Sequence, residues 1–163
     1  MTATTPMAVM AAMTSAAPHP SEDEQGYLAH CVAFSQVIAG RGYPFDEPAQ
    51  RDQALAEVKR AHNPTGFWRH IAAIAATGDL RLRLANITAP TLVLHGSDDP
   101  LVPPDAGKDT AANIKGAELL IVEGMGHDFP PSMFGFVAGA IADNARRMLN
   151  PVNHPDVTRP FAA

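Results

Sequence analysis

The stretch LHGSDDPLVP at residues 94–103 decides the fold, together with VEGMGHDFP at residues 122–130. Each follows a short apolar run, TLVLH at 91–95 or ELLIV at 118–122, of the kind that forms a strand buried on both faces of a parallel sheet. Ligands bind beyond the carboxyl ends of parallel strands, and both loops belong there. The sequence therefore predicts an α/β fold with a site at the ends of two strands.

These two loops carry one acid and one histidine that suit acyl-transfer chemistry. Such chemistry requires an acid that orients a histidine, and a histidine that takes a proton from a hydroxyl nucleophile. Asp99 and His127, at adjacent strand ends, meet that requirement. Gly124 and Gly126 allow the histidine loop to turn tightly. Asp98 is the neighbouring alternative for the acid, although it reads better as a solvated turn residue.

Both loops resemble those of the α/β-hydrolases. The pattern G-x-x-D-P-x-V-P at 96–103 resembles the acid loop of that superfamily, and G-x-G-H-x-x-P at 124–130 resembles its histidine loop. The order of acid before histidine also matches the superfamily. GYPFD at 42–46 further resembles bacterial esterases of the aclacinomycin methylesterase type. The resemblance implies a partial α/β-hydrolase fold, in which a helical lid precedes the last two strands of a parallel sheet and their helices.

The superfamily's nucleophile is missing from the sequence. That serine lies in a G-x-S-x-G turn, and the 163 residues contain no such pentapeptide. The five serines of the chain are Ser15, Ser21, Ser35, Ser97 and Ser132. Ser97, in the acid loop, lacks the strand-to-helix turn that would expose its hydroxyl. The resemblance therefore implies a chain that begins just after the nucleophile half, with the serine and most of the oxyanion hole supplied from outside it.

Residues 21–78 follow a helical pattern without a convincing strand. Ser21 with Glu24 three residues later has the form of a capping box, and it predicts a helix that ends near Gly40. Further helices are expected over residues 47–61, from 64 to a stop at 78, and over 105–114 and 132–149. In the last of these, Phe136, Ala140 and Ile141 are expected to face inward.

We expect three parts along the chain. They are a helical lid region at 1–85, the C-terminal part of the hydrolase core at 86–149, and a flexible tail at 150–163. In the lid region, aromatic side chains form either the lid core or the lining of an acyl or aromatic pocket. These are Tyr27, Phe34, Phe67 and Trp68.

The composition excludes several classes of protein. A net charge of −5 without a basic stripe argues against nucleic-acid binding. No run approaches the roughly eighteen apolar residues of a membrane span. The single cysteine, Cys31, reads as a small buried side chain and fits a reducing cytoplasm. The segment 1–17 has no lysine or arginine before its apolar stretch and is not read as a targeting signal. We expect a cytoplasmic protein.

The remaining histidines suggest no metal or cofactor. His30, His62 and His70 have no metal-like spacing with acidic or cysteine partners. His95 reads as a packed histidine at a strand end rather than as a catalyst. We therefore expect neither a metal nor a cofactor.

Two functions remain open. The first, which the resemblance implies, is hydrolysis of a small or medium apolar carboxylic ester, in which His127 would act as general base and then general acid and Asp99 would hold its tautomer. The alternative is a non-catalytic fragment or pseudo-hydrolase that acts only as a binding partner. In either case the strand at 91–95 should have an open edge. We expect this open edge to associate with a complementary N-terminal half or with a second copy of the chain. Otherwise the isolated chain should be only marginally stable.

Overall fold

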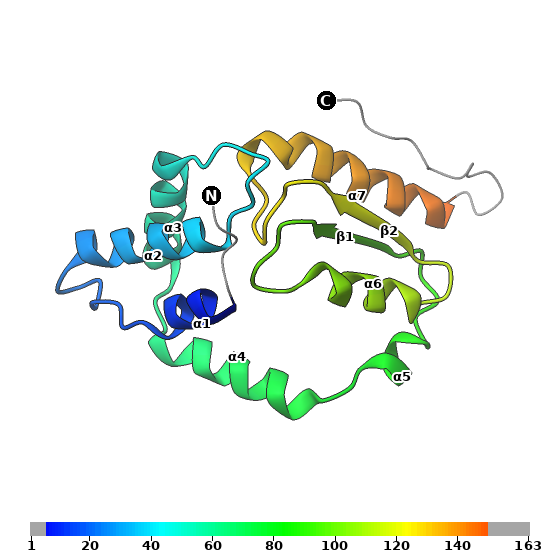
Figure 1. Cartoon of the computed structure of the whole chain (residues 1–163), viewed down its shortest axis with the longest axis horizontal. Coiled ribbons are helices and arrows are strands. Elements are labelled where there is room, and N and C mark those ends of the chain that lie inside the picture. The colour runs from blue at the N-terminus through cyan, green and yellow to red at the C-terminus, as the bar shows by residue number, and fades with distance from the viewer. Residues whose placement is uncertain (1–5, 150–163) are drawn as a thin grey trace.

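The computed structural model describes residues 6–149, which form two groups of elements (Figure 1). The first group is helical: α1 (Pro6–Thr14), α2 (Glu24–Ile38), α3 (Glu47–Arg60), α4 (Pro64–Thr77) and the short α5 (Arg81–Leu84). The second contains the strands: β1 (Leu92–Gly96), α6 (Pro104–Ala112), β2 (Glu118–Val122), the 3-10 turn η1 (Pro131–Met133) and α7 (Phe134–Leu149). The predicted tail at 150–163 lies outside the described residues.

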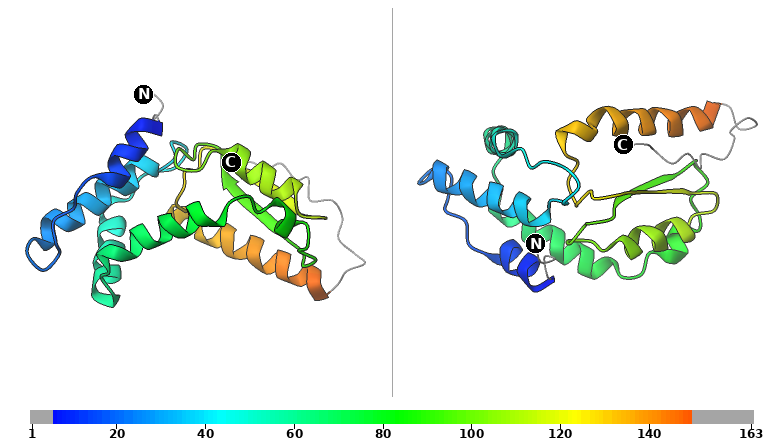
Figure 2. Two further views of the ribbon diagram at one scale, coloured as in Figure 1. Left: turned by 90° about the horizontal axis from the view of Figure 1, so that it is seen from below. Right: turned by 45° about the horizontal axis from the view of Figure 1, so that its top comes forward.

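The two strands are parallel neighbours, as predicted. Leu92 is opposite Glu118, and the register continues to Gly96 opposite Val122. Helices α6 and α7 lie on opposite faces of the strands (Figure 2), which gives a helix–sheet–helix arrangement. Both strands therefore end in the same region, and the loops that follow them meet there.

Helix α7 is fastened to the beginning of both strands. Asn144 donates to the carbonyl of Pro90 at 3.1 Å. The guanidinium of Arg147 lies 3.2 Å from the Glu118 carboxylate at the start of β2. At the other end of α7, Phe136 packs against a core of Val122, Met125 and Met133.

The strands are less buried than the sequence predicts. Among residues 6–149 the sheet has only two strands, so β1 has one edge without a neighbour. The β1 side chains from Leu92 to His95 are half-buried as a result, although helices cover both faces. Ile141 is also a correction: it was expected to face inward, but it is 64% exposed. Nothing within the described part of the chain covers that side of α7.

The helical group matches the sequence in its extents and differs in two details. Asp23, not the predicted Ser21, caps α2, since its carboxylate accepts from the backbone N–H of Gly26 at 2.8 Å. Gly78 ends α4 as predicted, with a φ of 66° that suits glycine. The helices α1 and α5 were not predicted. Val9 anchors α1 by burying its side chain almost completely.

None of the helices within residues 6–149 combines the length and apolar character that crossing a lipid bilayer requires.

Candidate active site

Asp99 is fixed by the loop that follows β1. Its side chain is almost completely buried, and Oδ1 accepts backbone N–H groups from Leu101 at 2.9 Å and Val102 at 2.9 Å. Hydrogen bonds to a carboxylate are among the stronger ones in proteins. This turn leaves Oδ2 free to face the loop that follows β2.

His127 meets Asp99 at that position. Its Nδ1 lies 2.9 Å from Asp99 Oδ2, and the ring is partly exposed. In the neutral tautomer with the proton on Nδ1, the Asp99 carboxylate accepts a hydrogen bond from Nδ1–H and Nε2 is the acceptor nitrogen. Within residues 6–149, Nε2 has no hydrogen-bond partner. The imidazole is therefore oriented by the acid and open on its outer side.

The helical group holds the histidine loop directly. The backbone N–H of His127 donates to the carbonyl of Ile38 at 3.0 Å, and that of Gly42 donates to the carbonyl of Gly124 at 2.8 Å. Gly124 has a φ of 71°, and a Cβ there would lie 2.5 Å from the Cα of Gly42. Glycine is required for this crossing, as the sequence predicted for the tight histidine loop.

Asp98 and Ser97 have supporting contacts instead of facing His127. The Ser97 hydroxyl accepts from the backbone N–H of Gly124 at 2.8 Å and donates to Asp98 Oδ1 at 3.1 Å. The N–H of Asp98 donates to the carbonyl of Met125 at 2.9 Å. These hydrogen bonds join the two loops, and the hydroxyl of Ser97 takes part in them as both acceptor and donor.

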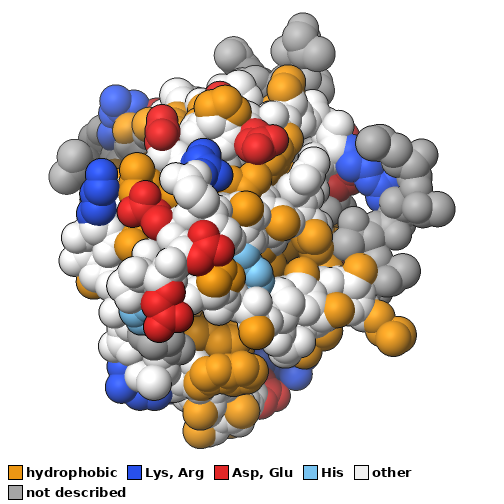
Figure 3. Space-filling view, turned by 90° about the vertical axis from the view of Figure 1, so that its left-hand side faces the viewer, with side chains coloured by type: hydrophobic (Ala, Val, Ile, Leu, Met, Phe, Trp, Pro, Cys, Tyr) orange, Lys and Arg blue, Asp and Glu red, His pale blue; other side chains and the backbone are white. Residues whose placement is uncertain are grey.

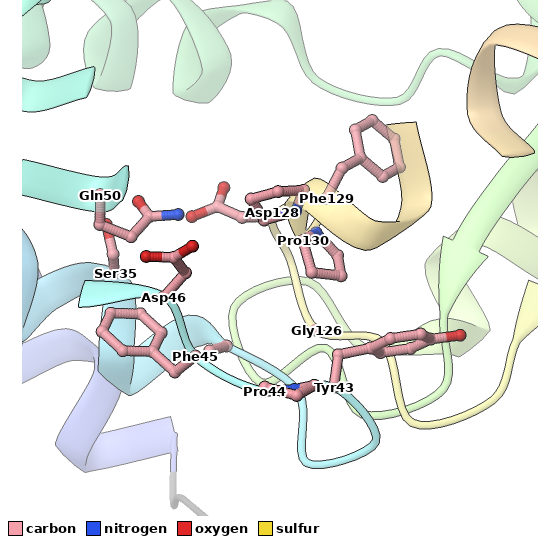
Figure 4. Close-up of a pocket in the computed structure, with 13 residues that line it drawn as sticks. Ser35, Tyr43, Pro44, Phe45, Asp46, Gln50, Gly126, Asp128, Phe129 and Pro130 are labelled. Carbon is pink, nitrogen blue, oxygen red and sulfur yellow. The ribbon is translucent and has the colours of Figure 1, made fainter. Parts of the chain in front are cut away.

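Asp128, directly after His127, borders a small cavity between the histidine loop and α3 (Figure 4). Its carboxylate points toward the amide of Gln50. The cavity has a volume of about 30 Å³, room for little more than a water molecule. Partial removal from water, with the nearby carboxylates of Asp99 and Glu57, raises the pKa of Asp128, and the neighbouring His127 opposes that shift.

A much larger hollow lies among α1, α2, α3 and α4. Its volume is about 770 Å³, within the range of small-molecule sites. Its lining includes the aromatic residues singled out in the sequence, Tyr27, Phe34, Phe67 and Trp68. Figure 3 shows hydrophobic side chains gathered around a histidine on the face formed by these helices. The aromatic residues thus surround an open space instead of filling a lid core.

Two further residues of the hollow's lining, Glu57 and Cys31, carry titratable side chains. Glu57 lines the hollow and also raises the pKa of Asp128, so the two carboxylates lie in each other's field. Cys31 belongs to the same lining and is half-buried, whereas the sequence predicts a buried side chain. Burial raises the pKa of its thiol, the opposite of what a cysteine nucleophile needs. Cys31 therefore does not have the character of a nucleophile.

Metal-binding side chains do not converge in the part of the chain that the structure describes. No three histidine, cysteine, aspartate or glutamate side chains of residues 6–149 are grouped so that they could hold an ion. His62 instead stacks edge-on against His19 and Tyr27, with ring centroids 5.0 Å and 5.4 Å apart.

Residues 28–130 match a protein family described as Serine aminopeptidase, S33. The chain belongs to this family. The family lies within the α/β-hydrolase superfamily, so the resemblance seen in the two loops is confirmed. The matched residues include most of the helical group, both strands and both loops.

Relatives and solved structures agree with that assignment. The chain is 27% identical over 128 residues to rhodomycin D methylesterase DnrP of Streptomyces peucetius, which covers 78% of this chain and 43% of that protein. It is 28% identical over 127 residues to rhodomycin D methylesterase DauP of Streptomyces sp. (strain C5), with the same coverage of 78% and 43%. An esterase of Exiguobacterium antarcticum superimposes with a TM-score of 0.58 at 24% identity, covering 86% of this chain and 48% of that one. The chain thus spans less than half the length of these proteins.

Some features of the site were not predicted from the sequence. One is the hydrogen bond from the His127 backbone to Ile38, and another is the contribution of α1 to the hollow. Both are contacts between segments far apart in the sequence, and no residue pattern predicts such contacts. The contact of His95 with the acid loop was also missed, although the ring was correctly expected to be packed at the strand end: its side chain is 13% exposed.

Proposed function

We propose that Asp99 and His127 are the acid and base of a Ser-His-Asp triad that hydrolyses carboxylic esters. The observation that carries this proposal is the 2.9 Å contact between His127 Nδ1 and the buried Asp99 carboxylate, with Nε2 open on the other side. A general base must present a free nitrogen to the hydroxyl that it deprotonates, and this ring does so. Membership of the family supports the same chemistry.

In the proposed reaction, His127 Nε2 accepts the proton of a serine hydroxyl while the oxygen attacks the ester carbonyl. Asp99 stabilises the imidazolium that forms, and the imidazolium then protonates the departing alcohol. Water repeats the sequence on the acyl-enzyme and releases the acid. The serine and most of the oxyanion hole come from polypeptide outside the 163 residues, because this sequence contains no G-x-S-x-G.

The proposed substrate is an ester with an apolar, ring-bearing body. The hollow of about 770 Å³ and its aromatic lining are suited to such a group. The relatives named rhodomycin D methylesterases favour a methyl ester as the bond that is cleaved. In this proposal residues 1–85 are the lid that selects the ester, and residues 86–149 belong to the core that cleaves it.

The second candidate is a binding partner without catalysis of its own. The open edge of β1 and the exposed Ile141 favour it, because unpaired strand edges and large apolar patches promote association. The partner is either a complementary nucleophile-bearing half or a second copy of the chain.

Ester hydrolysis separates the two candidates. The nucleophile-bearing half of DnrP is joined before Met1, and hydrolysis of a methyl ester and of a nitrophenyl ester is measured. We expect hydrolysis that falls by about 10³-fold or more in His127→Ala and in Asp99→Ala. The matched control, His70→Ala, changes an exposed histidine and should retain full activity. Equal hydrolysis in all four proteins would reject the proposed roles of Asp99 and His127.

A further inference from the structure

We propose that His95 is a positioning residue for the triad acid: its Nε2–H braces the acid loop, and so keeps Asp99 Oδ2 facing His127. The inference rests on the proposed function, because it matters only if Asp99 and His127 act as a pair. It goes beyond the expectation that His95 is merely packed.

The proposed brace consists of contacts that link His95, Val102 and the Asp99 carboxylate. His95 Nε2 lies 2.9 Å from the carbonyl of Val102, which accepts a hydrogen bond from Nε2–H. The N–H of the same Val102 donates to Asp99 Oδ1 at 2.9 Å. The imidazole of His95 is thus hydrogen-bonded to Val102, and the backbone N–H of Val102 is hydrogen-bonded to the Asp99 carboxylate.

The same nitrogen also approaches the acid directly. His95 Nε2 lies 3.5 Å from Asp99 Oδ2, the oxygen that accepts the 2.9 Å hydrogen bond from His127 Nδ1. One carboxylate oxygen therefore faces two imidazoles, one from the end of β1 and one from the loop after β2.

Helix α6 leaves room for the ring at one position. A Cβ at Gly107 would lie 2.7 Å from His95 Nδ1, closer than atoms of packed side chains approach. Gly107 is buried, so an added methyl group would displace the ring and move its Nε2 away from Val102. The position of the His95 ring therefore depends on the absence of a side chain at Gly107.

A packed ring and a bracing donor differ in what can replace them. If only volume matters, methionine and glutamine at position 95 should behave alike, since they have similar length and bulk. If the N–H matters, glutamine should succeed where methionine fails, because its amide N–H can reach the Val102 carbonyl.

The test is the tautomer of His127, followed by ¹⁵N NMR of the whole chain at a pH where the ring is neutral. The wild-type chain and His95→Gln should show Nδ1–H with Nε2 unprotonated. In His95→Met a population with Nε2–H should appear, and the Val102 amide should exchange about tenfold faster. Gly107→Ala keeps the donor but displaces it, and it should produce the same change.

The outcomes distinguish the brace from the proposed function. An unchanged His127 tautomer in both His95→Met and Gly107→Ala would overturn the brace and leave the acid–base pair intact. A His95→Gln chain that loses the tautomer as fully as His95→Met would also overturn it, since packing alone would then explain the residue. A wild-type chain with the proton on Nε2 would instead reject the Asp99–His127 pair itself.

Discussion

The carboxyl ends of the two strands and the open side of the sheet are built very differently. At the strand ends, Asp99 is buried, its two oxygens are hydrogen-bonded, and the crossing loops leave space only for glycine. By the open side we mean two exposed features together: the edge of β1 that has no neighbouring strand among residues 6–149, and a row of large apolar side chains on α7. These are Phe134, Ile141 and Met148, which are 57%, 64% and 62% exposed.

The difference between the two regions is whether their side chains and backbone groups find partners within the described residues. Residues seven apart share a face of a helix, so the exposed row on α7 is a continuous stripe. Its exposure leaves unrealised the hydrophobic free energy that its burial would supply. By contrast, the backbone and carboxylate contacts at the strand ends are formed within the chain. The contacts that orient Asp99 and His127 are thus complete within the described residues.

The largest effect should come from removing the acid. Asp99→Ala leaves the N–H groups of Leu101 and Val102 and the ring of His127 without their acceptor. We expect the free energy of unfolding, measured in urea, to fall by about 2–4 kcal/mol. Asp105→Ala is the control, since it removes an exposed carboxylate paired only with Lys108, and it should change stability by less than about 0.5 kcal/mol. Similar losses of unfolding free energy in the two variants would mean that the contacts of Asp99 stabilise the fold no more than an exposed ion pair does.

A single methyl group should have opposite effects in the two regions. Gly40→Ala would place a Cβ against the backbone of Gly124 and Gly126, so we expect a loss of about 2 kcal/mol. Gly139→Ala lies within α7 with nothing within 4 Å of the new Cβ, and should increase stability by about 0.5–1 kcal/mol. Urea denaturation measures both. Changes of the same sign would contradict the comparison.

Association tests the open side. We expect the purified chain to form concentration-dependent oligomers in light scattering, and Ile141→Glu to reduce their mass without lowering Tm, since its side chain is already exposed. Ala56→Glu makes the same charge change at an exposed position on α3 and should leave association unchanged. A monomer at all concentrations in the wild-type chain would remove the argument that this side requires a partner.

The smallest effect concerns Asp128 and pH. Its raised pKa means that the folded state disfavours the ionised carboxylate, so its penalty is present at neutral pH and disappears below the ordinary carboxyl range. Asp128→Asn should therefore raise Tm by about 1–2 °C at pH 7, and the difference should vanish as the pH falls below about 4. Scanning calorimetry across this range measures it. A variant that is less stable than the wild-type chain at pH 7 would contradict the sign.

The sequence predicted the strand ends well because their chemistry is local. Parallel strands place their carboxyl ends together, so two loops with an acid and a histidine could be paired without coordinates. The choice of Asp99 over Asp98 followed from the loop pattern, and the structure places Asp99 beside His127.

The rest depended on contacts between distant segments. Ile38 holds the backbone of His127, and no side-chain pattern reports such a bond. The prediction that Ile141 faces inward was wrong, because helical periodicity identifies an apolar face but not whether anything covers it. The cap of α2 was misplaced for a simpler reason: Asp23 and Ser21 are both good N-caps, and only the position of the first turn decides between them.

The most direct test of the account is fluorophosphonate labelling read by intact mass, because the probe reports an activated serine whatever the natural ester is. We predict no adduct on the 163-residue chain alone. With the nucleophile-bearing half of DnrP joined before Met1, we predict one adduct, on the serine of that half, which is lost in His127→Ala. A stoichiometric, His127-dependent adduct on one of the chain's own five serines would contradict the account, because the nucleophile would then lie within this sequence.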